Sequence, residues 1–355
     1  MSLVQLPEKA LFYQPWGIGD MIMFTPVMLN FKRYFPDTRI DLACRNEVKA
    51  LMKNCPWIRK IFQLPNPQKR TFRNVFKIFR DIRREHYPLV FAAASVTTTR
   101  LGNIFVSLCG AKAIVGNSKK YLFSNKVVYS CPVNHNIHRV DQNGCLFKAL
   151  MGDDVDYRVE FHKPVSEEDE KKAASILKEL GFQNKKLLGV HAGCDPANYH
   201  KQWGANKFNQ LLSSFLSDYE DACIFCFLGP GEDRATSTYP KDNFEDRVVI
   251  IREQLGVVAV LLAECSLVLT SDSGLGHIAR AMGTPVLAIM GPANPVEVAP
   301  YGPDGHFITL TPILDCMPCR PYQKTCDKKE NYCLTKLSVS QVKSQLYNLW
   351  EKYTA

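Results

Sequence analysis

The chain has 355 residues, which exceeds the roughly 250–300 residues at which one hydrophobic core stops growing, so two domains are expected. Hydrophobic residues make up 46% of the chain and charged residues 22%, a composition that excludes a disordered protein and a small disulfide-stapled scaffold. The net charge of +9 points to an anionic partner. Nucleic acid, an acidic membrane surface and a phosphorylated small molecule all fit that charge.

The thirteen cysteines favour a reducing compartment, because their number is odd and most lie in core-like stretches, such as Cys223 and Cys226. The first residues lack the basic and apolar regions of a secretory signal. The longest apolar stretch, residues 256–263, is far shorter than the ~20 residues that span a bilayer. The sequence therefore predicts a cytoplasmic protein without a transmembrane segment.

Short apolar runs alternate with helical periodicity along the whole chain, as is typical of βαβ units and parallel sheets. In the first half we expect strands at residues 10–14, 39–43, 89–93 and 113–115, with helices between them. A charged helix follows, from a Ser166/Asp169 capping pattern to Gly181 at its end. In the second half we expect buried strands at 187–193, 222–229, 247–251, 267–271 and 285–291, and helices at 205–217, 254–264, 276–282 and 338–352.

The alternation predicts an α/β fold of two Rossmann-like doubly wound domains, residues 1–183 and 184–337, followed by a closing C-terminal helix, residues 338–355. The hinge is expected near Gly181–Lys186. Ligands of such sheets bind at the carboxyl ends of the strands, so we expect a substrate in a cleft between the two domains.

The first loop, Trp16–Met21, has two glycines of a dinucleotide fingerprint, but the third position falls on Ile22, which disfavours a Rossmann dehydrogenase. The loop presents Asp20, for which a helix N-cap and a catalytic base are equally good interpretations. Thr25 and Pro26 form a good N-cap and N1 pair. Either the helix begins there and Asp20 lies in the loop, or Pro26 lies in the early turns of a longer helix.

Two loops of the second half place polar residues after expected strands. Lys201 precedes Trp203 by two residues, which provides a cation and an aromatic face, although a solvated lysine beside a packed tryptophan explains the pair as well. Glu232 ends a Gly-Pro-Gly-Glu loop and is suited to accept hydrogen bonds from sugar hydroxyls, or to form a simple turn.

The loop after residues 267–271 reads Asp272, Ser273, Gly274, Leu275, Gly276 and His277. Its small residues lead into a helix N-terminus, where free N–H groups and the macrodipole suit a diphosphate. His277 can add a hydrogen bond or a charge to that site. Asp272 would repel a diphosphate, so we expect it to anchor backbone N–H groups of its own turn or to bind neutral hydroxyls; a capping Asp and a satisfied helix histidine are the alternative.

A basic amphipathic helix is predicted between Gln68 and Glu85. Its apolar face comprises Phe72, Val75, Phe76, Phe79 and Ile82, and its basic residues are Lys69, Arg70, Arg73, Lys77, Arg80, Arg83 and Arg84. The helix is suited to contact anionic lipid headgroups or a phosphorylated acceptor, or to pack its apolar face inward with a solvated basic back. The two interpretations are compatible, because the apolar face can pack inward while the basic face meets the acceptor. Nucleic acid is the least favoured partner, because no recognised binding motif is present.

Metal sites have two candidates in the sequence. Asp154 and Asp156 have the spacing of a diphosphate-metal pair but precede the hinge, so we interpret them as a solvated turn and expect no catalytic metal. The late cysteines Cys316, Cys319, Cys326 and Cys333 form a possible structural cluster, for which a bound metal or labile bridges and free thiols are equal alternatives.

Together these segments resemble glycosyltransferase family 9, the heptosyltransferase family. The resemblance rests on the Gly19-Asp20 loop with Pro26 behind it, the His-Ala-Gly segment with Lys201 and Trp203, Gly231-Glu232, and above all the block 272–277 followed by Gly-Thr-Pro and Gly-Pro. It implies a glycosyltransferase-B fold, with the acceptor held by residues 1–183 and the nucleotide-sugar donor by residues 184–337. It also implies inverting, metal-independent transfer of heptose from ADP-heptose to a lipopolysaccharide-core acceptor, with no cofactor required.

Carried over to this sequence, the resemblance makes Asp20 the catalytic base, Lys201 a cation near the donor phosphates and Glu232 a donor-binding residue. Asp272 through His277 become the diphosphate loop. The implied partners are a nucleotide-sugar and an anionic glycolipid or glycan, met at the inner face of the cytoplasmic membrane. A nucleotide-sugar epimerase or hydrolase, and a non-catalytic nucleotide-sugar or lipid-binding protein, remain as alternatives.

Overall fold

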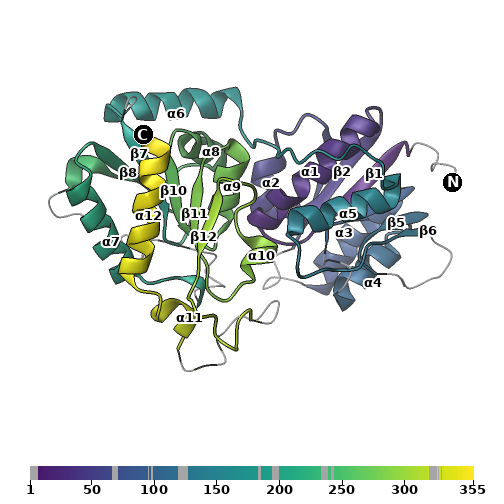
Figure 1. The fold of residues 1–355 in the computed structure, drawn as a ribbon. Helices are drawn as coiled ribbons and strands as arrows, with labels where there is room; N and C mark the ends of the chain where they lie inside the picture. The colour runs from purple at the N-terminus through teal and green to yellow at the C-terminus, as the bar shows by residue number, and fades with distance from the viewer. Residues whose placement is uncertain are drawn as a thin grey trace. The chain divides into compact units, whose positions relative to one another are not determined.

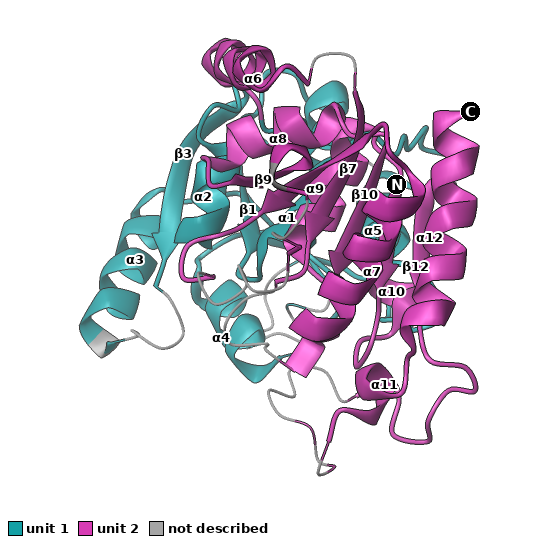
Figure 2. Ribbon diagram, turned by 90° about the vertical axis from the view of Figure 1, so that its left-hand side faces the viewer, with its two compact units in different colours: residues 1–164 teal, residues 165–355 magenta. Residues whose placement is uncertain are grey.

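The computed structural model divides the chain into two compact units, residues 1–164 (unit 1) and 165–355 (unit 2), and each is an α/β domain (Figure 1, Figure 2). The structure describes residues 7–65, 71–94, 96, 99–118, 127–182, 185–193, 200–232, 239–240, 244–319, 326, 328 and 330–355. The helices and strands below lie within these ranges.

Unit 1 is built on a parallel six-stranded sheet in the order β3-β2-β1-β4-β5-β6, as far as the described residues show. The strands are β1 (Lys9–Gln14), β2 (Arg39–Arg45), β3 (Ile58–Leu64), β4 (Leu89–Ala92), β5 (Ala113–Val115) and β6 (Val127–Tyr129). The helices are α1 (Ile18–Tyr34), α2 (Asn46–Met52), α3 (Phe72–Arg84), α4 (Arg100–Leu108) and α5 (Arg139–Met151). The strand order reverses between β1 and β4, which is where a doubly wound sheet binds its ligand.

Aromatic side chains pack α1 onto the centre of this sheet. The Phe12 ring of β1 stacks on Phe91 of β4 at 5.5 Å and meets Phe31 of α1 edge-on at 5.2 Å. Phe24 of α1 contacts both strands' phenylalanines at 5.8 and 5.9 Å. These buried rings fix the start of α1 beside the carboxyl end of β1.

Unit 2 repeats the same topology, with a parallel sheet in the order β12-β11-β10-β7-β8-β9. The strands are β7 (Lys186–His191), β8 (Ala222–Phe227), β9 (Val248–Ile251), β10 (Leu267–Ser271), β11 (Val286–Ile289) and β12 (Gly305–Ile308). The helices are α6 (Glu167–Leu180), α7 (Ala205–Asp218), α8 (Leu255–Ala263), α9 (Gly274–Met282), α10 (Pro295–Val298), α11 (Tyr332–Thr335) and α12 (Val339–Thr354), with a 3₁₀ turn η4 (Glu245–Arg247). Here the strand order reverses between β7 and β10.

The units divide between Pro164 and Val165, so α6 belongs to unit 2, whereas the expected boundary lies between residues 183 and 184. The reason is packing: the Asp169 carboxylate lies against the backbone of Gly256 in α8, and Lys172 pairs with Glu253. The predicted Ser166/Asp169 capping box and the left-handed Gly181 at the end of α6 are both present.

The closing helix α12 begins with a second capping box, in which Ser338 and Gln341 exchange hydrogen bonds. Its Trp350 is almost fully buried and meets Phe215 of α7 edge-on, with the ring centroids 4.9 Å apart. The C-terminal helix is therefore part of the core of unit 2.

The predicted α/β class with two Rossmann-like domains is confirmed. Three strands are missing from the prediction: β3, β6 and β12, each at a sheet edge. Edge strands bury only part of their side chains, and β3 exposes Arg59, Lys60 and Gln63, so it has no continuous apolar run.

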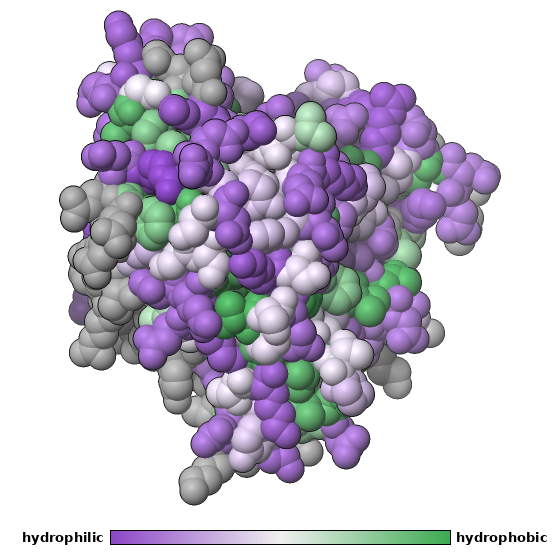
Figure 3. Space-filling view, turned by 60° about the vertical axis from the view of Figure 1, so that its left-hand side comes forward, coloured by the Kyte–Doolittle hydropathy of each residue, from purple (hydrophilic) through white to green (hydrophobic). Residues whose placement is uncertain are grey.

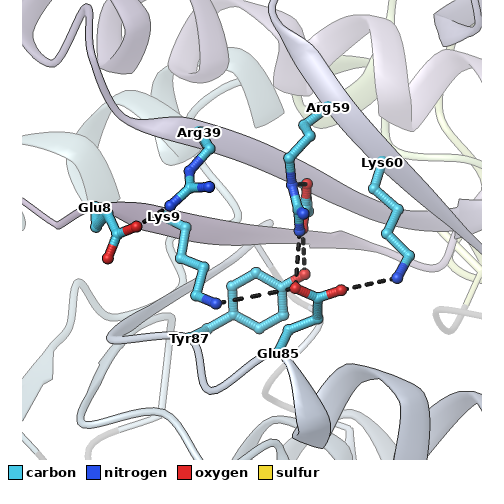
Figure 4. A network of polar contacts seen from close by, with 8 residues as sticks. Glu8, Lys9, Arg39, Arg59, Lys60, Glu85 and Tyr87 are labelled. Carbon is cyan, nitrogen blue, oxygen red and sulfur yellow. Dashed lines mark hydrogen bonds and ion pairs between the residues drawn. The ribbon is translucent and has the colours of Figure 1, made fainter.

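An ion-pair network ties β1, β2 and β3 to the turn before β4 (Figure 4). Its centre is Asp41 of β2, which has no exposed surface and accepts hydrogen bonds from the Arg59 guanidinium, at 2.9 Å from Nε, and from the Tyr87 hydroxyl. Glu85 accepts hydrogen bonds from Arg59 at 2.9 Å and from Lys60 at 2.8 Å. The Lys60 hydrogen bond first, and then Arg59, lower the pKa of Glu85 to about 2, although its partial burial opposes the shift.

The visible face in Figure 3 is mainly hydrophilic, with hydrophobic side chains in small separate groups. Among the described helices, none combines the length and the apolar composition needed to cross a bilayer.

Candidate active site

Asp20 lies in the first turn of α1, directly beyond the carboxyl end of β1. The helix begins at Ile18 with Gly17 as its N-cap, so Asp20 is the third helical residue and is not the N-cap. Of the two predicted starts, the longer helix is the correct one. Asp20 is partly buried in the first turn, where the helix macrodipole stabilises a negative charge.

The helix tolerates Pro26 because a side chain replaces the missing donor. Proline has no N–H for the carbonyl of Ile22, and the Thr25 hydroxyl donates to that oxygen instead, at 2.8 Å. Gln14, which is buried at the end of β1, donates from Nε2 to the backbone oxygen of Asp20 at 3.2 Å and accepts from the Trp16 N–H at 3.1 Å. The turn that presents Asp20 is therefore braced on both sides.

A polar cavity of about 560 Å³ opens in unit 1 where β2 and β3 end. Its lining residues are Asn46, Glu47, Gln63, Leu64, Pro65, Asn74, Lys77 and Ile78. Arg45 connects the cavity with the first loop, because its guanidinium lies 5.9 Å from the Trp16 ring and 3.7 Å from Glu47 Oε1. A cavity of this volume with amide, carboxylate and ammonium groups suits a sugar.

In unit 2, His191 joins the two strands on either side of the point where the strand order reverses. It ends β7, and its Nδ1 lies 2.9 Å from the Ser273 hydroxyl, which follows β10. Its Nε2 lies 3.3 Å from Glu232 Oε2. The Ser273 hydroxyl also lies 2.9 Å from the Thr270 hydroxyl, so it does not cap its own helix.

The Glu232 carboxylate is buried against the backbone and ionised. The Gly229 N–H donates to Oε2 at 2.6 Å, and the carboxylate lies so close to Gly193 that no Cβ would fit there. Burial raises the pKa of Glu232, but the hydrogen bond with His191 and the Gly229 N–H outweigh it, so the pKa lies below its ordinary value. A fixed acceptor at this edge suits ligand hydroxyls.

Lys201 and Asp272 form a second pair at the same edge, with Nζ donating to Oδ2 at 2.6 Å. The Asp272 side chain is 9% exposed and the Lys201 side chain 25%. Asp272 thus accepts from the ammonium group of Lys201, which the sequence did not predict, while its binding of neutral ligand hydroxyls stays a prediction. The pairing explains how a carboxylate is tolerated beside a predicted diphosphate site, since Lys201 offsets its charge.

The loop 272–277 leads into the N-terminus of α9, as predicted, although the helix begins two residues before the expected start at 276. Gly274 begins the helix after Ser273, and His277 is buried in its first turn. Gly276 leaves no room for a side chain, because a Cβ would lie 2.9 Å from the Thr270 methyl group. The close packing of α9 on β10 aims the first-turn N–H groups at the carboxyl edge of the sheet.

The basic residues of the amphipathic stretch lie on α3 of unit 1, except Lys69 and Arg70, which lie outside the described residues. Lys77 lines the polar cavity. Arg83 donates to the backbone oxygen of Leu108, and Arg73, Arg80 and Arg84 are exposed. Of the apolar residues, Ile82 is buried, but Val75 and Phe76 are 38% and 53% exposed, so inward packing, one of the interpretations left open by the sequence, does not hold for these two residues.

The late cysteines Cys316, Cys319, Cys326 and Cys333 all line one cavity of about 20 Å³. Burial first, and then the neighbouring sulfurs, raise the pKa of Cys333 to about 11. Within the described part of the chain, no group of three or more potential ligands is arranged to hold a metal ion. The metal interpretation of this cluster therefore stays a prediction. Asp156 lies 2.9 Å from Arg158 and is 61% exposed, in accord with a solvated turn.

Sequence reasoning missed His191, Gln14 and the polar cavity. His191 stands at the end of an expected strand, which is where sheet ligands bind, so its position was a usable signal. Its partners Ser273 and Glu232 are 82 and 41 residues away, and no spacing pattern reports such contacts.

The chain matches one protein family and is similar to several proteins of known structure. Residues 75–330 match the family model of glycosyltransferase family 9 (heptosyltransferase). Lipooligosaccharide heptosyltransferase 2 of Campylobacter jejuni is 23% identical over 347 residues, which cover 96% of this chain and 98% of that protein. The solved structure of Escherichia coli ADP-heptose lps heptosyltransferase II has a TM-score of 0.71 at 16% identity, and the match covers 98% of this chain and 100% of that one. A family 9 glycosyl transferase of Veillonella parvula has a TM-score of 0.75 at 20% identity, covering 97% of each chain.

Two doubly wound units, each with polar side chains at the carboxyl edge of its sheet, define the fold class of the GT-B glycosyltransferases, and the solved structures share it over nearly their full length. The family match spans most of the sequence. The chain belongs to glycosyltransferase family 9, the heptosyltransferase family, and is a glycosyltransferase.

Proposed function

We propose that the chain transfers a heptose from ADP-heptose to a lipopolysaccharide-core acceptor, by direct displacement with inversion and without a metal cofactor. The observation that carries the proposal is the set of polar residues at the carboxyl edge of unit 2, where His191 connects Ser273 and Glu232 and where Lys201 pairs with Asp272. The names of the relatives support the sugar and the acceptor class, and the similar fold of the E. coli ADP-heptose lps heptosyltransferase II supports the donor.

In unit 2, the donor diphosphate would lie at the N-terminus of α9. Ser273 is engaged by His191 and Thr270, so the first-turn N–H groups receive no bond from the N-cap side chain and are suited to phosphate oxygens. The Lys201 ammonium, whose charge is offset by Asp272, would turn one of its remaining N–H groups to the phosphates, and His277 stands in the first turn of α9. Glu232, held in place from both sides, would accept hydrogen bonds from the hydroxyls of the donor.

In unit 1, Asp20 would act as the general base. Its carboxylate takes the proton of the acceptor hydroxyl while the hydroxyl oxygen forms a bond to the anomeric carbon. The bond from that carbon to the diphosphate oxygen breaks in the same step, on the opposite face of the sugar. The Gln14 brace limits the movement of the turn. The polar cavity beside Arg45 and Lys77 is suited to the acceptor sugar and its charged groups.

Charge on the leaving diphosphate would be stabilised by the chain's own groups. In other transferases a bound cation stabilises the negative charge of the leaving diphosphate. Here that charge would be stabilised by groups already held in place before the reaction: the N–H dipoles of α9, an ammonium group and a histidine. Transfer at this donor site would therefore need no metal ion.

The test is release of ADP from ADP-heptose with and without a lipopolysaccharide-core acceptor. Release that requires the acceptor supports transfer. Release without acceptor identifies a hydrolase, and binding of ADP-heptose without release identifies a binding protein; either result contradicts the proposal. UDP- and GDP-sugars serve as control donors, and none of them should release its nucleoside diphosphate in place of ADP-heptose.

A further inference from the structure

The segment that connects unit 1 with unit 2 runs along helix α1. Residues 152–165 lie between α5 and the capping residue of α6, and they form neither helix nor strand. Because the two units are contiguous in the sequence, this segment is their single covalent connection. Its first part is held in unit 1: the Tyr157 ring lies 5.6 Å from the Phe147 ring of α5 and fills the space beside Gly144, where a Cβ would come within 2.9 Å of it.

A buried amide side chain of α1 makes both backbone hydrogen bonds of Arg158. Asn30 is 3% exposed, its Nδ2 donates to the Arg158 oxygen at 2.6 Å, and its Oδ1 accepts from the Arg158 N–H at 3.0 Å. Asn30 thus binds the connecting segment as a neighbouring strand would, and an apolar residue in its place would leave two buried backbone groups without partners.

Thr25 provides a second anchor, four residues further along the segment. Its hydroxyl, which donates to the Ile22 oxygen in place of the missing Pro26 N–H, also accepts from the His162 N–H at 3.2 Å. The His162 ring meets the Trp57 ring edge-on, with the centroids 5.7 Å apart. The backbone and the side chain of His162 are therefore both held within unit 1.

The far end of the segment is fixed in unit 2. Ser166 caps α6, and α6 is held against α8 by the packing of Asp169 on Gly256. Between the last anchor in unit 1 and the first in unit 2 lie Lys163, Pro164 and Val165 alone. The proline ring fixes φ at one of these three residues, which limits their freedom further.

We propose that Thr25 and Asn30 are positioning residues that clamp the connecting segment on α1 and confine the hinge between the units to residues 163–165. The effect on catalysis rests on the proposed function, in which the donor held by unit 2 must meet Asp20 of unit 1. Loss of the His162 anchor would lengthen the free linker from three residues to seven, 159–165. Since the effective concentration of two linked partners falls with about the −3/2 power of linker length, they would meet about 3.5-fold less often.

Hydrogen exchange of the full chain, resolved by residue, tests the clamp itself. The amides of Arg158 and His162 should be protected although they lie outside helices and strands. Thr25→Val keeps the shape of the side chain but removes the acceptor, so the His162 amide should exchange about fivefold faster, as expected for one lost hydrogen bond. Thr25→Ser keeps the hydroxyl and should exchange like the wild type.

Acceptor-dependent release of ADP tests the effect on transfer. Thr25→Val/His162→Ser removes both contacts of residue 162, so kcat should fall about 3.5-fold while the dissociation constant of ADP-heptose stays unchanged. Adding Pro26→Ala returns a backbone N–H to the Ile22 oxygen and repairs α1, but kcat should stay low, because the linker is still free.

Thr38→Val is the matched control for a merely structural role. It removes another buried threonine hydroxyl of unit 1, which donates to the Pro7 oxygen at 2.7 Å, and should lower stability without changing kcat. Circular dichroism checks that each variant is folded. Unprotected amides at Arg158 and His162, an unchanged kcat in Thr25→Val/His162→Ser, a kcat that Pro26→Ala restores, or an equal fall in Thr38→Val would each overturn the proposal. Absence of ADP release in the wild type would refute the proposed function alone, since the exchange measurement involves no transfer.

Discussion

Replacing Arg59 with methionine should destabilise unit 1 by about 3 kcal/mol. Methionine keeps an unbranched apolar stem but removes the guanidinium that holds the Asp41 carboxylate, which has no exposed surface. Removing one partner of a buried ion pair costs about 3–5 kcal/mol, since it leaves an uncompensated charge. The lower end applies because the Tyr87 hydroxyl still donates to Asp41 and because the Arg59 side chain is 38% exposed, which lets water reach the site.

Urea unfolding at pH 7, followed by circular dichroism, measures this loss, with each transition fitted separately if the two units unfold in steps. Arg39→Met is the matched control in the same sheet. Its partner Glu8 is 76% exposed, so the loss should stay below about 1 kcal/mol. The double variant Asp41→Leu/Arg59→Met should recover part of the stability, because it removes both charges together. Equal losses for Arg59→Met and Arg39→Met would refute the reasoning.

Three further predictions concern pH, the donor and metals. The folded pKa of Glu85 is about 2, below the ordinary 4.5, so its contribution to stability is complete above pH 4.5 and is lost as the pH falls toward 2. Lys60→Met should therefore make the loss of stability with falling pH less steep between pH 4.5 and 2. An unchanged profile would count against the ion-pair network. Glu232→Gln should raise the dissociation constant of ADP-heptose about tenfold in calorimetry, since a charge-assisted hydrogen bond is lost, whereas Glu253→Gln, a surface control in the same unit, should not change it. Turnover should be undiminished in excess EDTA, and a loss that Mg²⁺ restores would contradict metal-independent transfer.

The central strands could be predicted from the sequence because they are buried on both faces and leave continuous apolar runs, as in β8 and β10. The ends of α6 could be predicted because capping is local, requiring only Ser166, Asp169 and Gly181. The edge strand β3 could not be predicted, since one side of it faces solvent. Because β3 was not predicted, the polar cavity was not predicted either, since its wall includes Gln63 at the end of that strand.

The individual site residues were predictable by type and place, but their pairing was not. Lys201 and Asp272 stand 71 residues apart, and only the fold places the ammonium group on the carboxylate. The exposure of Phe76 was equally hidden, because an amphipathic pattern identifies an apolar face without showing what covers it. The sequence did not decide where α1 begins. Pro26 suits the first turn of a helix, and the hydrogen bond from the Thr25 hydroxyl to the Ile22 carbonyl, which compensates for Pro26 inside the helix, is not visible in the sequence.

The most direct test of the account is the rate of acceptor-dependent ADP release by Asp20→Asn. Asparagine keeps the size of the side chain but cannot take a proton, so the rate should fall about 10²–10⁴-fold while the affinity for ADP-heptose stays unchanged. Asp37→Asn, an exposed aspartate shortly after the same helix, should retain full activity. Near-normal transfer by Asp20→Asn would contradict the assignment of Asp20 as the base.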